Sequence, residues 1–461
     1  MQVRGILRVC ALTLVVATIT ALLFQRSARP DILLISIDSL RHDHLGVSGY
    51  ARDTTPNLDA LARQGVLFRQ AISASSWTLP AHVTLLTALP PERHGVVSPA
   101  DALAPSAVSL AEVLRDAGYA TAGFVSGPFL RELHGFSQGF EVYDDDIAAK
   151  DLHASHRGRT SPQLLRRFRD WLVARPASDG RPWFVFVHMW DVHYDYEPPP
   201  PWDTMFDPTY TGAVTGRNFE LGPTIKRGMA RRDLDHVIAL YDGEIRYTDE
   251  HLGQIVGVLT GRGRLRNTLI VVTADHGEEF FEHGAKGHGK NLHDETIRIP
   301  LVMAYPGVVP AGQVIDQQVQ LADIAPTILG LAGVSPPLGF ARGAGSGGID
   351  LAPSLRGYLA VPRGRRAHSA LAVGAPMTSV RQEEVKYIKR NGGGAEVFDL
   401  RADPGERRNL SRKGVVPPVA EALVEADRER ARSAAVGRTF REPARATAAH
   451  EQRLRGLGYI R

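Results

Sequence analysis

Cysteine is almost absent from this chain of 461 residues, which contains only Cys10. A single cysteine excludes both a disulfide framework and a cysteine-based metal site within the chain, so any metal ion must be bound by histidine and oxygen ligands. Aromatic residues make up 7%, charged residues 23% and hydrophobic residues 43% of the sequence. These values are typical of a globular protein with one large or two unequal domains, and they exclude collagenous, disordered and polytopic membrane proteins.

The chain also has little excess charge of either sign, with 54 basic against 50 acidic residues. The excess lies in residues 401–461, which hold thirteen arginines and one lysine against eight acidic residues. A protein face that follows a phosphate backbone normally has aromatic residues interleaved with its basic residues, and these arginines lack that interleaving. We therefore expect no nucleic-acid partner.

One long hydrophobic run lies near the N-terminus. Residues 9–24 are apolar or small and follow two arginines, Arg4 and Arg8. The run is longer than most signal-peptide cores and slightly short for a membrane span, so residues 1–29 form either a cleaved signal peptide or a retained membrane anchor. A buried core helix is the less favoured alternative. The basic flank predicts export of the remaining chain to the periplasm or the cell exterior.

Three apolar runs of strand length end in residues that can bind a metal ion. The runs and the residues that follow them are 32–37 with Asp38, 183–187 with His188, and 268–274 with Asp275 and His276. Continuous apolar runs are typical of strands buried on both faces. Helical patterns at 57–65 and 242–259 alternate with them and predict an α/β fold, with a large, mainly parallel sheet flanked by helices. In such sheets the site lies beyond the carboxyl ends of the strands.

The C-terminal part of the chain has a different pattern. A passage rich in glycine and proline at 335–348 is followed by short alternating strands within 383–400 and by a charged helix over 419–432. This pattern predicts a smaller C-terminal subdomain. The mixed charges of the helix indicate a solvated face rather than a binding patch.

A metal site is the best explanation for Asp38 and Asp275. A carboxylate at the end of a buried strand is unfavourable unless it is paired or binds a cation, and two separate strands end in this way. His276 adds a nitrogen ligand. This mixture predicts one divalent ion and suits manganese, zinc or magnesium better than calcium, which favours oxygen ligands only. The alternative is that each aspartate caps the helix that follows it.

Thr78 lies where a small polar loop passes into an apolar helix, within residues 75–87. Pro80 fits the first turn of that helix. A helix start offers N–H donors and a positive dipole to an anionic phosphate or sulfate, and a metal ion lowers the pKa of a nearby hydroxyl. An ordinary threonine cap is the alternative.

The loop after Asp275 contains His283, His288, Lys286 and Lys290, although the whole chain has only seven lysines. An ammonium group can bind an anionic ester oxygen, and an imidazole can protonate a leaving group. We expect His288 and Lys290 to act in this way, although single histidines are often structural. A second metal ion is also left open, with candidate ligands Asp191, His193, His283 and His293.

From Asp31 to about Leu410 the chain resembles the sulfatase family of the alkaline phosphatase superfamily. The stretches that carry the resemblance are residues 35–46, 55–59, 85–87, 94–96, 273–278, 322–329 and 397–404. The resemblance implies a catalytic α/β domain over residues 30–360, with a divalent metal ion at its strand ends. It also implies a smaller C-terminal α+β subdomain, which with a basic helical tail would occupy residues 361–461.

The nucleophile motif departs from the family pattern. The formylglycine enzymes of the family carry Cys/Ser-x-Pro-x-Arg, and the matching stretch here is Thr78-Leu79-Pro80-Ala81-His82. Threonine cannot be oxidised to the aldehyde hydrate that these enzymes use. Ser39 replaces a second aspartate of the family, and His276 replaces its usual asparagine. The chain instead resembles the one-metal site of lipoteichoic acid synthases and phosphoethanolamine transferases, with Asp38, Thr78, Asp275 and His276 as the ligands.

Our leading hypothesis is a metal-dependent hydrolase or transferase in which Thr78 attacks a phosphate ester or diester. His193, His288 and Lys290 would bind the anion or assist the leaving group. One alternative is sulfate-ester hydrolysis without formylglycine, and another is a catalytically silent envelope binding protein on the same fold. The partner would be a small or polymeric anionic ester, and the sequence does not indicate an oligomeric state. The loops expected to select this substrate are residues 144–162 and 198–222.

Overall fold

The computed structural model describes most of the chain. The described residues are 29–148, 160–176, 178–338, 340, 347–413, 418–436 and 440–444. The predicted signal peptide or anchor lies outside them, apart from its last residue. Within these ranges, no helix combines the length and the apolar character that a membrane span requires.

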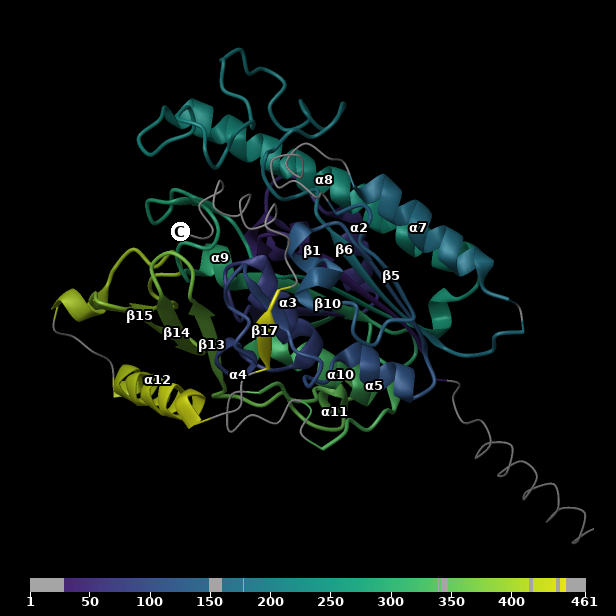
Figure 1. The fold of residues 1–461 in the computed structure, drawn as a ribbon. Coiled ribbons are helices and arrows are strands. Elements are labelled where there is room, and N and C mark those ends of the chain that lie inside the picture. The colour runs from purple at the N-terminus through teal and green to yellow at the C-terminus, as the bar shows by residue number, and fades with distance from the viewer. Residues whose placement is uncertain are drawn as a thin grey trace, which may run out of the picture.

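A nine-stranded sheet forms the centre of the described structure (Figure 1). Its strands, in spatial order, are β11 (Gln313–Ile315), β2 (Val66–Ile72), β10 (Arg298–Ala304), β7 (Thr268–Ala274), β1 (Asp31–Ile37), β6 (Trp183–Met189), β4 (Ala120–Val125) and β5 (Val142–Asp144), with β12 (Val319–Gln320) paired to β2. Strand β10 runs antiparallel to its two neighbours, whereas the other pairs are parallel. Every residue of β1, β6 and β7 is buried, as the continuous apolar runs predict.

Helices cover both faces of the sheet. In Figure 1, α7 (Ser161–Ala174) and α8 (Arg231–Gly261) lie above it, and α5 (Leu110–Asp116) and α10 (Ile324–Ala332) lie below it. Helix α2 (Pro56–Arg63) packs against α8. The α/β fold with a mainly parallel sheet is therefore confirmed.

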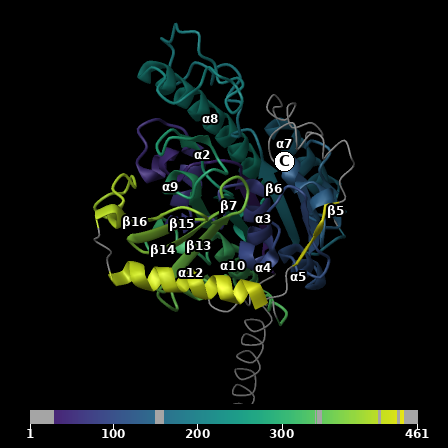
Figure 2. The same cartoon turned by 60° about the vertical axis from the view of Figure 1, so that its left-hand side comes forward.

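A second, antiparallel sheet follows in the C-terminal part of the chain. It consists of β13 (Arg366–Leu371), β14 (Met377–Gln382), β15 (Val385–Arg390) and β16 (Ala395–Asp399). Figure 2 shows α12 (Pro418–Val436) running along this sheet, and the two share a small apolar core. This arrangement confirms a smaller α+β unit, while the boundary at residues 360 and 361 stays a prediction.

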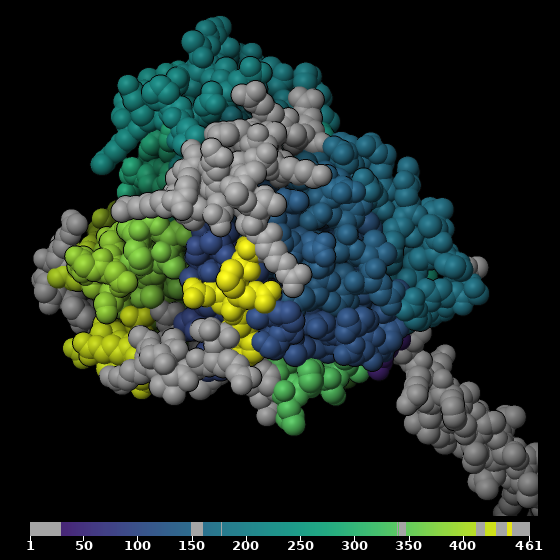
Figure 3. All heavy atoms as spheres, in the orientation of Figure 1, coloured from purple at the N-terminus to yellow at the C-terminus, as the bar shows by residue number. Residues whose placement is uncertain are grey.

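Several contacts join the small unit to the large one, among them a strand pairing and a cluster of buried charges. Strand β17 (Arg441–Pro443) pairs with β3 (Asp101–Leu103), and Figure 3 shows this C-terminal strand lying on the surface of the N-terminal half. The second contact is ionic and buried. The Lys386 ammonium lies 2.8 Å from a carboxylate oxygen of Asp294 and 2.9 Å from one of Glu406. Burial raises the pKa of Glu406 to about 7, although Lys386 opposes this shift.

This raised pKa predicts a pH-dependent stability. Glu406 favours the protonated form in the folded state, so its contribution is fully present below the unfolded pKa of 4.5 and is lost as the pH rises through about 7. The side chain of Glu406→Gln cannot ionise, so between pH 4.5 and 7.5 its free energy of unfolding should fall less than that of the wild type. The difference between the two decreases should be about 3 kcal/mol at most. Urea unfolding at the two pH values measures the difference, with the partly exposed Glu384→Gln as control. Equal pH slopes in wild type and Glu406→Gln contradict the prediction.

Candidate active site

Two buried carboxylates meet at the carboxyl edge of the large sheet. Asp38 follows β1 and Asp275 follows β7, and these neighbouring parallel strands are in register at Ile37 and Ala274. Both aspartates are fully buried. The backbone N–H of Ser39 donates to Asp275 Oδ1 over 3.3 Å. Residues more than two hundred positions apart in the chain are thus brought together by strand pairing alone.

Thr78 and His276 complete this cluster. Thr78 is the first residue of α3 (Thr78–Thr87), and its hydroxyl lies 3.3 Å from Asp38 Oδ2 and 3.3 Å from His276 Nε2. His276 Nδ1 lies 2.9 Å from the carbonyl oxygen of Gly277. Because Nδ1 donates to that carbonyl, Nε2 is the nitrogen that faces Thr78 and the aspartates.

The two carboxylates differ in their surroundings. Burial and the nearby Asp38 carboxylate raise the pKa of Asp275 well above its usual value, and Asp275 Oδ2 has no hydrogen-bond partner among the described residues. Burial also opposes ionisation of Asp38, but neighbouring imidazoles, led by His188, outweigh it and lower the pKa of Asp38. An unpaired buried oxygen beside a second carboxylate is unfavourable without a cation. The site therefore fits a divalent ion, with Asp38, Thr78, Asp275 and His276 as the residues that would hold it.

Two further histidines adjoin this cluster: His188, which the sequence places at a strand end, and His82, which the sequence marks only as the replacement of the family arginine. His82, at the position of the family arginine, is fully buried, and burial lowers its pKa well below the usual value, so it is neutral. Its ring nitrogens lie 2.9 Å from the carbonyl oxygen of Thr78 and 2.9 Å from the hydroxyl of Ser36. His188 lies in β6 opposite Ser36, and its Nε2 is 3.3 Å from Asp38 Oδ2.

The predicted anion-binding residues lie at different depths around Thr78. The His288 ring is 4.3 Å from the His276 ring and 5.0 Å from the His193 ring, measured between centroids. Burial lowers the pKa of His288 well below its usual value. Lys290 is partly exposed, and its ammonium lies 2.5 Å from a carboxylate oxygen of Glu220. The catalytic roles of these residues stay predictions.

The other candidate metal ligands have contacts that account for them without an ion. Asp191 accepts hydrogen bonds from the backbone N–H groups of Thr160 and Ser161 and so caps α7. His283 and His293 stack with their centroids 3.5 Å apart and their planes 4° apart. An imidazole nitrogen binds a metal ion through a lone pair in the plane of its ring. One ion cannot lie in the planes of two rings that are stacked in parallel. Potential ligand atoms of His283, His293 and Glu295 lie within 4.8 Å of one another, but both ring nitrogens of His283 already have protein partners, and a second metal ion stays a prediction.

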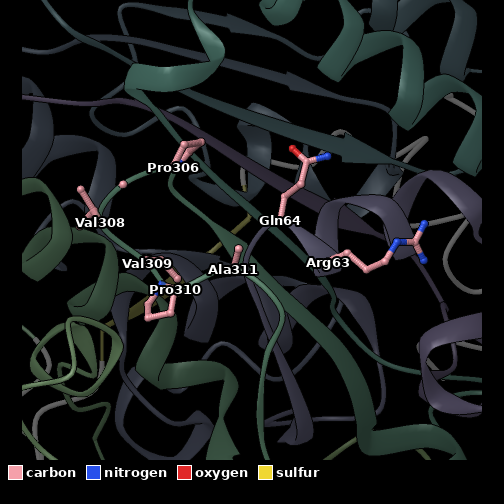
Figure 4. A pocket seen from close by; sticks show the side chains of 8 residues that line it. Arg63, Gln64, Pro306, Val308, Val309, Pro310 and Ala311 are labelled. Atoms are coloured by element: carbon pink, nitrogen blue, oxygen red, sulfur yellow. The ribbon is translucent and has the colours of Figure 1, made fainter.

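The described structure also has a surface pocket of about 560 Å³, whose lining residues are shown in Figure 4. It is lined by Arg63, Gln64 and residues 306–311, which follow the end of β10. Because β10 runs antiparallel to β7, these residues lie at the edge of the sheet opposite to Asp275. The lining contains neither histidine nor carboxylate, and we assign no part of the chemistry to this pocket.

The fold and the cluster at the strand ends together define an α/β protein with a candidate metal-binding site beside the Thr78 hydroxyl. The family model "Sulfatase" matches residues 30–334. The chain therefore belongs to the sulfatase family, whose members are metal-dependent, and it is an ester hydrolase of the alkaline phosphatase superfamily.

Individual relatives resemble the chain over most of its length. It is 24% identical to an ulvan-active sulfatase of Formosa agariphila, over 83% of this chain and 77% of the relative. It is 26% identical to a choline-sulfatase of Rhizobium meliloti, over 87% and 86% respectively. Among solved structures, a phosphonate monoester hydrolase of Agrobacterium radiobacter superposes with a TM-score of 0.69 at 25% identity, covering 88% of this chain and 95% of that one.

Removing one of the two carboxylates tests the cation site. We expect saturating Mn²⁺ to raise the melting temperature of the wild type, because ligands that bind the folded state alone stabilise it. Asp275→Asn should lose this increase, and without metal it should be at least as stable as the wild type, since it relieves the repulsion with Asp38. Thermal unfolding with and without Mn²⁺ measures both effects. The exposed Asp316→Asn is the matched control, and a full metal response in Asp275→Asn contradicts the assignment.

Proposed function

We propose that the protein hydrolyses phosphate esters, diesters above all, through a covalent phosphothreonine at Thr78. The observation that carries the proposal is the placement of the Thr78 hydroxyl, 3.3 Å from both Asp38 and His276 at the start of α3. This is also the position that matches the nucleophile of the family. A helix start favours an anion through its N–H groups and its dipole.

The proposed reaction has two steps. Asp38 Oδ2 accepts the proton of the Thr78 hydroxyl as the bond between Oγ1 and phosphorus forms, and the bond between phosphorus and the leaving oxygen breaks. The leaving oxygen takes a proton from His193 or solvent, whereas the neutral His288 would only donate a hydrogen bond to the anion. Water then attacks phosphorus as the bond to Thr78 Oγ1 breaks. Asp38 returns its proton to Oγ1, and the group that protonated the leaving oxygen takes the proton of the water. An acceptor alcohol in place of water would make the enzyme a transferase. When bound, a divalent ion would lower the pKa of the hydroxyl and offset the negative charge that develops.

The side chain of threonine favours phosphorus over sulfur as the atom attacked. A formylglycine hydrate has two hydroxyl groups on one carbon, so its sulfate can leave by elimination through the second hydroxyl. Thr78 has one hydroxyl, and its covalent intermediate must be cleaved at phosphorus or sulfur by a second nucleophile. The family's usual route to release sulfate is therefore closed to this chain.

The charge of the site favours a singly charged ester. His82 and His288 are neutral, because burial lowers the pKa of each, and Lys290 is paired with Glu220. A divalent ion would be balanced by Asp38 and Asp275 alone, which leaves little positive charge for a dianionic phosphate monoester. A phosphodiester or a phosphonate monoester carries one charge. The structural likeness to a phosphonate monoester hydrolase supports this choice.

Sulfate esters are the second candidate, because both curated relatives described above are sulfatases. A panel of aryl substrates separates the candidates: a phosphodiester, a phosphonate monoester, a phosphate monoester and a sulfate, each with added manganese, zinc, magnesium or calcium. We expect the highest kcat/KM for the two singly charged phosphorus esters. A higher value for the sulfate contradicts the phosphoester assignment, and no turnover by the metal-loaded protein would favour the silent binding protein.

Replacing the nucleophile tests the covalent step. We expect Thr78→Ala to reduce kcat by more than about 1,000-fold while Mn²⁺ still binds, because the aspartates and His276 remain. Thr78→Ser should retain measurable turnover. Intact-mass analysis of acid-quenched reactions should show a phosphoryl adduct on the wild type and none on Thr78→Ala. The matched control is Thr84→Ala, which removes another buried hydroxyl of α3. Unchanged turnover in Thr78→Ala refutes the nucleophile.

A further inference from the structure

His188 is a buried imidazole with unfilled hydrogen-bonding capacity. It lies at the end of β6, and its ring is fully buried. Within the described part of the chain, neither of its ring nitrogens has a hydrogen-bond partner. A buried polar group without a partner is unfavourable by about 1–3 kcal/mol and is rare in folded proteins. Its Nε2 lies 3.3 Å from Asp38 Oδ2 without meeting hydrogen-bond geometry, so the imidazole has capacity for a cation beside that carboxylate.

The surroundings of His188 fix the direction of its ring. At Gly127 any Cβ would come within 2.6 Å of His188 Cε1, so the backbone there lies directly against the ring. The His82 ring packs against it edge to face, with centroids 4.8 Å apart. Nε2 is held 3.3 Å from Asp38 Oδ2, an oxygen that is also 3.3 Å from the Thr78 hydroxyl. Ligands that share one ion at about 2.1 Å are themselves roughly 3.0–3.5 Å apart.

His188 also lies near the second carboxylate. The potential ligand atoms of His82, His188 and Asp275 are within 4.8 Å of one another, as are those of Asp38, Asp275 and His276. Asp275 belongs to both groups. His188 Nε2 is also 3.3 Å from Asp38 Oδ2, so the two groups border one another.

His82 is the weaker ligand of the two additional histidines. Its Nδ1 donates to the carbonyl oxygen of Thr78, and its Nε2 accepts from the hydroxyl of Ser36, so both nitrogens are satisfied. These contacts fasten the first turn of α3 to β1 and make His82 a positioning residue for Thr78. The lone pair available to a cation is on His188.

We propose that His188 is a fifth ligand of the ion that Asp38, Thr78, Asp275 and His276 would hold. The inference rests on the metal site of the proposed function and extends it. The donor set then contains two imidazole nitrogens instead of one. Nitrogen ligands favour zinc and manganese over magnesium and calcium, so His188 would set the metal preference of the enzyme.

Pulsed electron paramagnetic resonance on Mn²⁺-loaded protein counts the coordinated imidazole nitrogens directly and does not depend on turnover. We expect two such nitrogens in the wild type, one in His188→Gln and one in His276→Gln. His82→Gln is the matched control and should keep two. Equilibrium dialysis should show that His188→Gln weakens Mn²⁺ binding by more than about tenfold and Mg²⁺ binding by less.

The outcomes separate this inference from the proposed function. One imidazole nitrogen in the wild type, retained in His188→Gln and lost in His276→Gln, overturns the role of His188 and leaves the four-ligand site intact. The role of His188 is also overturned if the wild type shows two coordinated imidazole nitrogens and one of them is lost in His82→Gln rather than in His188→Gln. A wild type that binds no Mn²⁺ overturns both the inference and the metal site. Should His188→Gln fail to fold, the count in the wild type and in His82→Gln still decides the question.

Discussion

The structure depends on the approach of two buried carboxylates, Asp38 and Asp275, at the ends of adjacent parallel strands. Because β1 and β7 pair in register up to Ile37 and Ala274, the two aspartates that follow these strands lie side by side. Burial and the nearby Asp38 carboxylate raise the pKa of Asp275 well above its usual value. Like charges in a dry interior repel strongly, so a cation between the two carboxylates is favoured when both are ionised. The Thr78 hydroxyl and His276 Nε2 face the same region.

The chemistry follows from what surrounds this pair. The sulfatase fold supplies the strand ends, but the residue at the start of α3 is a threonine, and its neighbour one turn later is a neutral histidine. In the function that we propose, this site supports direct attack by the Thr78 hydroxyl on an ester with a single negative charge. The replacement of the family arginine by His82 fits the same interpretation. The His82 ring contacts the carbonyl oxygen of Thr78 in the first turn of α3 and is therefore not directed at an anion.

The sequence predicts those parts of the fold and site that follow from local pattern. The buried strands, the mainly parallel sheet and the C-terminal strands β15 and β16 are confirmed, since continuous or alternating apolar runs encode them. Helix α8 begins earlier than expected, at Arg231, because its first turns are charged and exposed. Long-range contacts are not readable in this way: the pairing of Lys290 with Glu220, and the register that sets His188 opposite Ser36, both require the folded chain.

The most direct test of the shared cation site is anomalous X-ray diffraction from crystals of the protein grown with Mn²⁺, recorded above and below the manganese absorption edge. The account predicts one strong anomalous peak within about 2.0–2.4 Å of oxygens from Asp38, Thr78 and Asp275 and of a nitrogen from His276. The account would be contradicted by a structure in which the four side chains are ordered but point away from one another, with no anomalous peak between them.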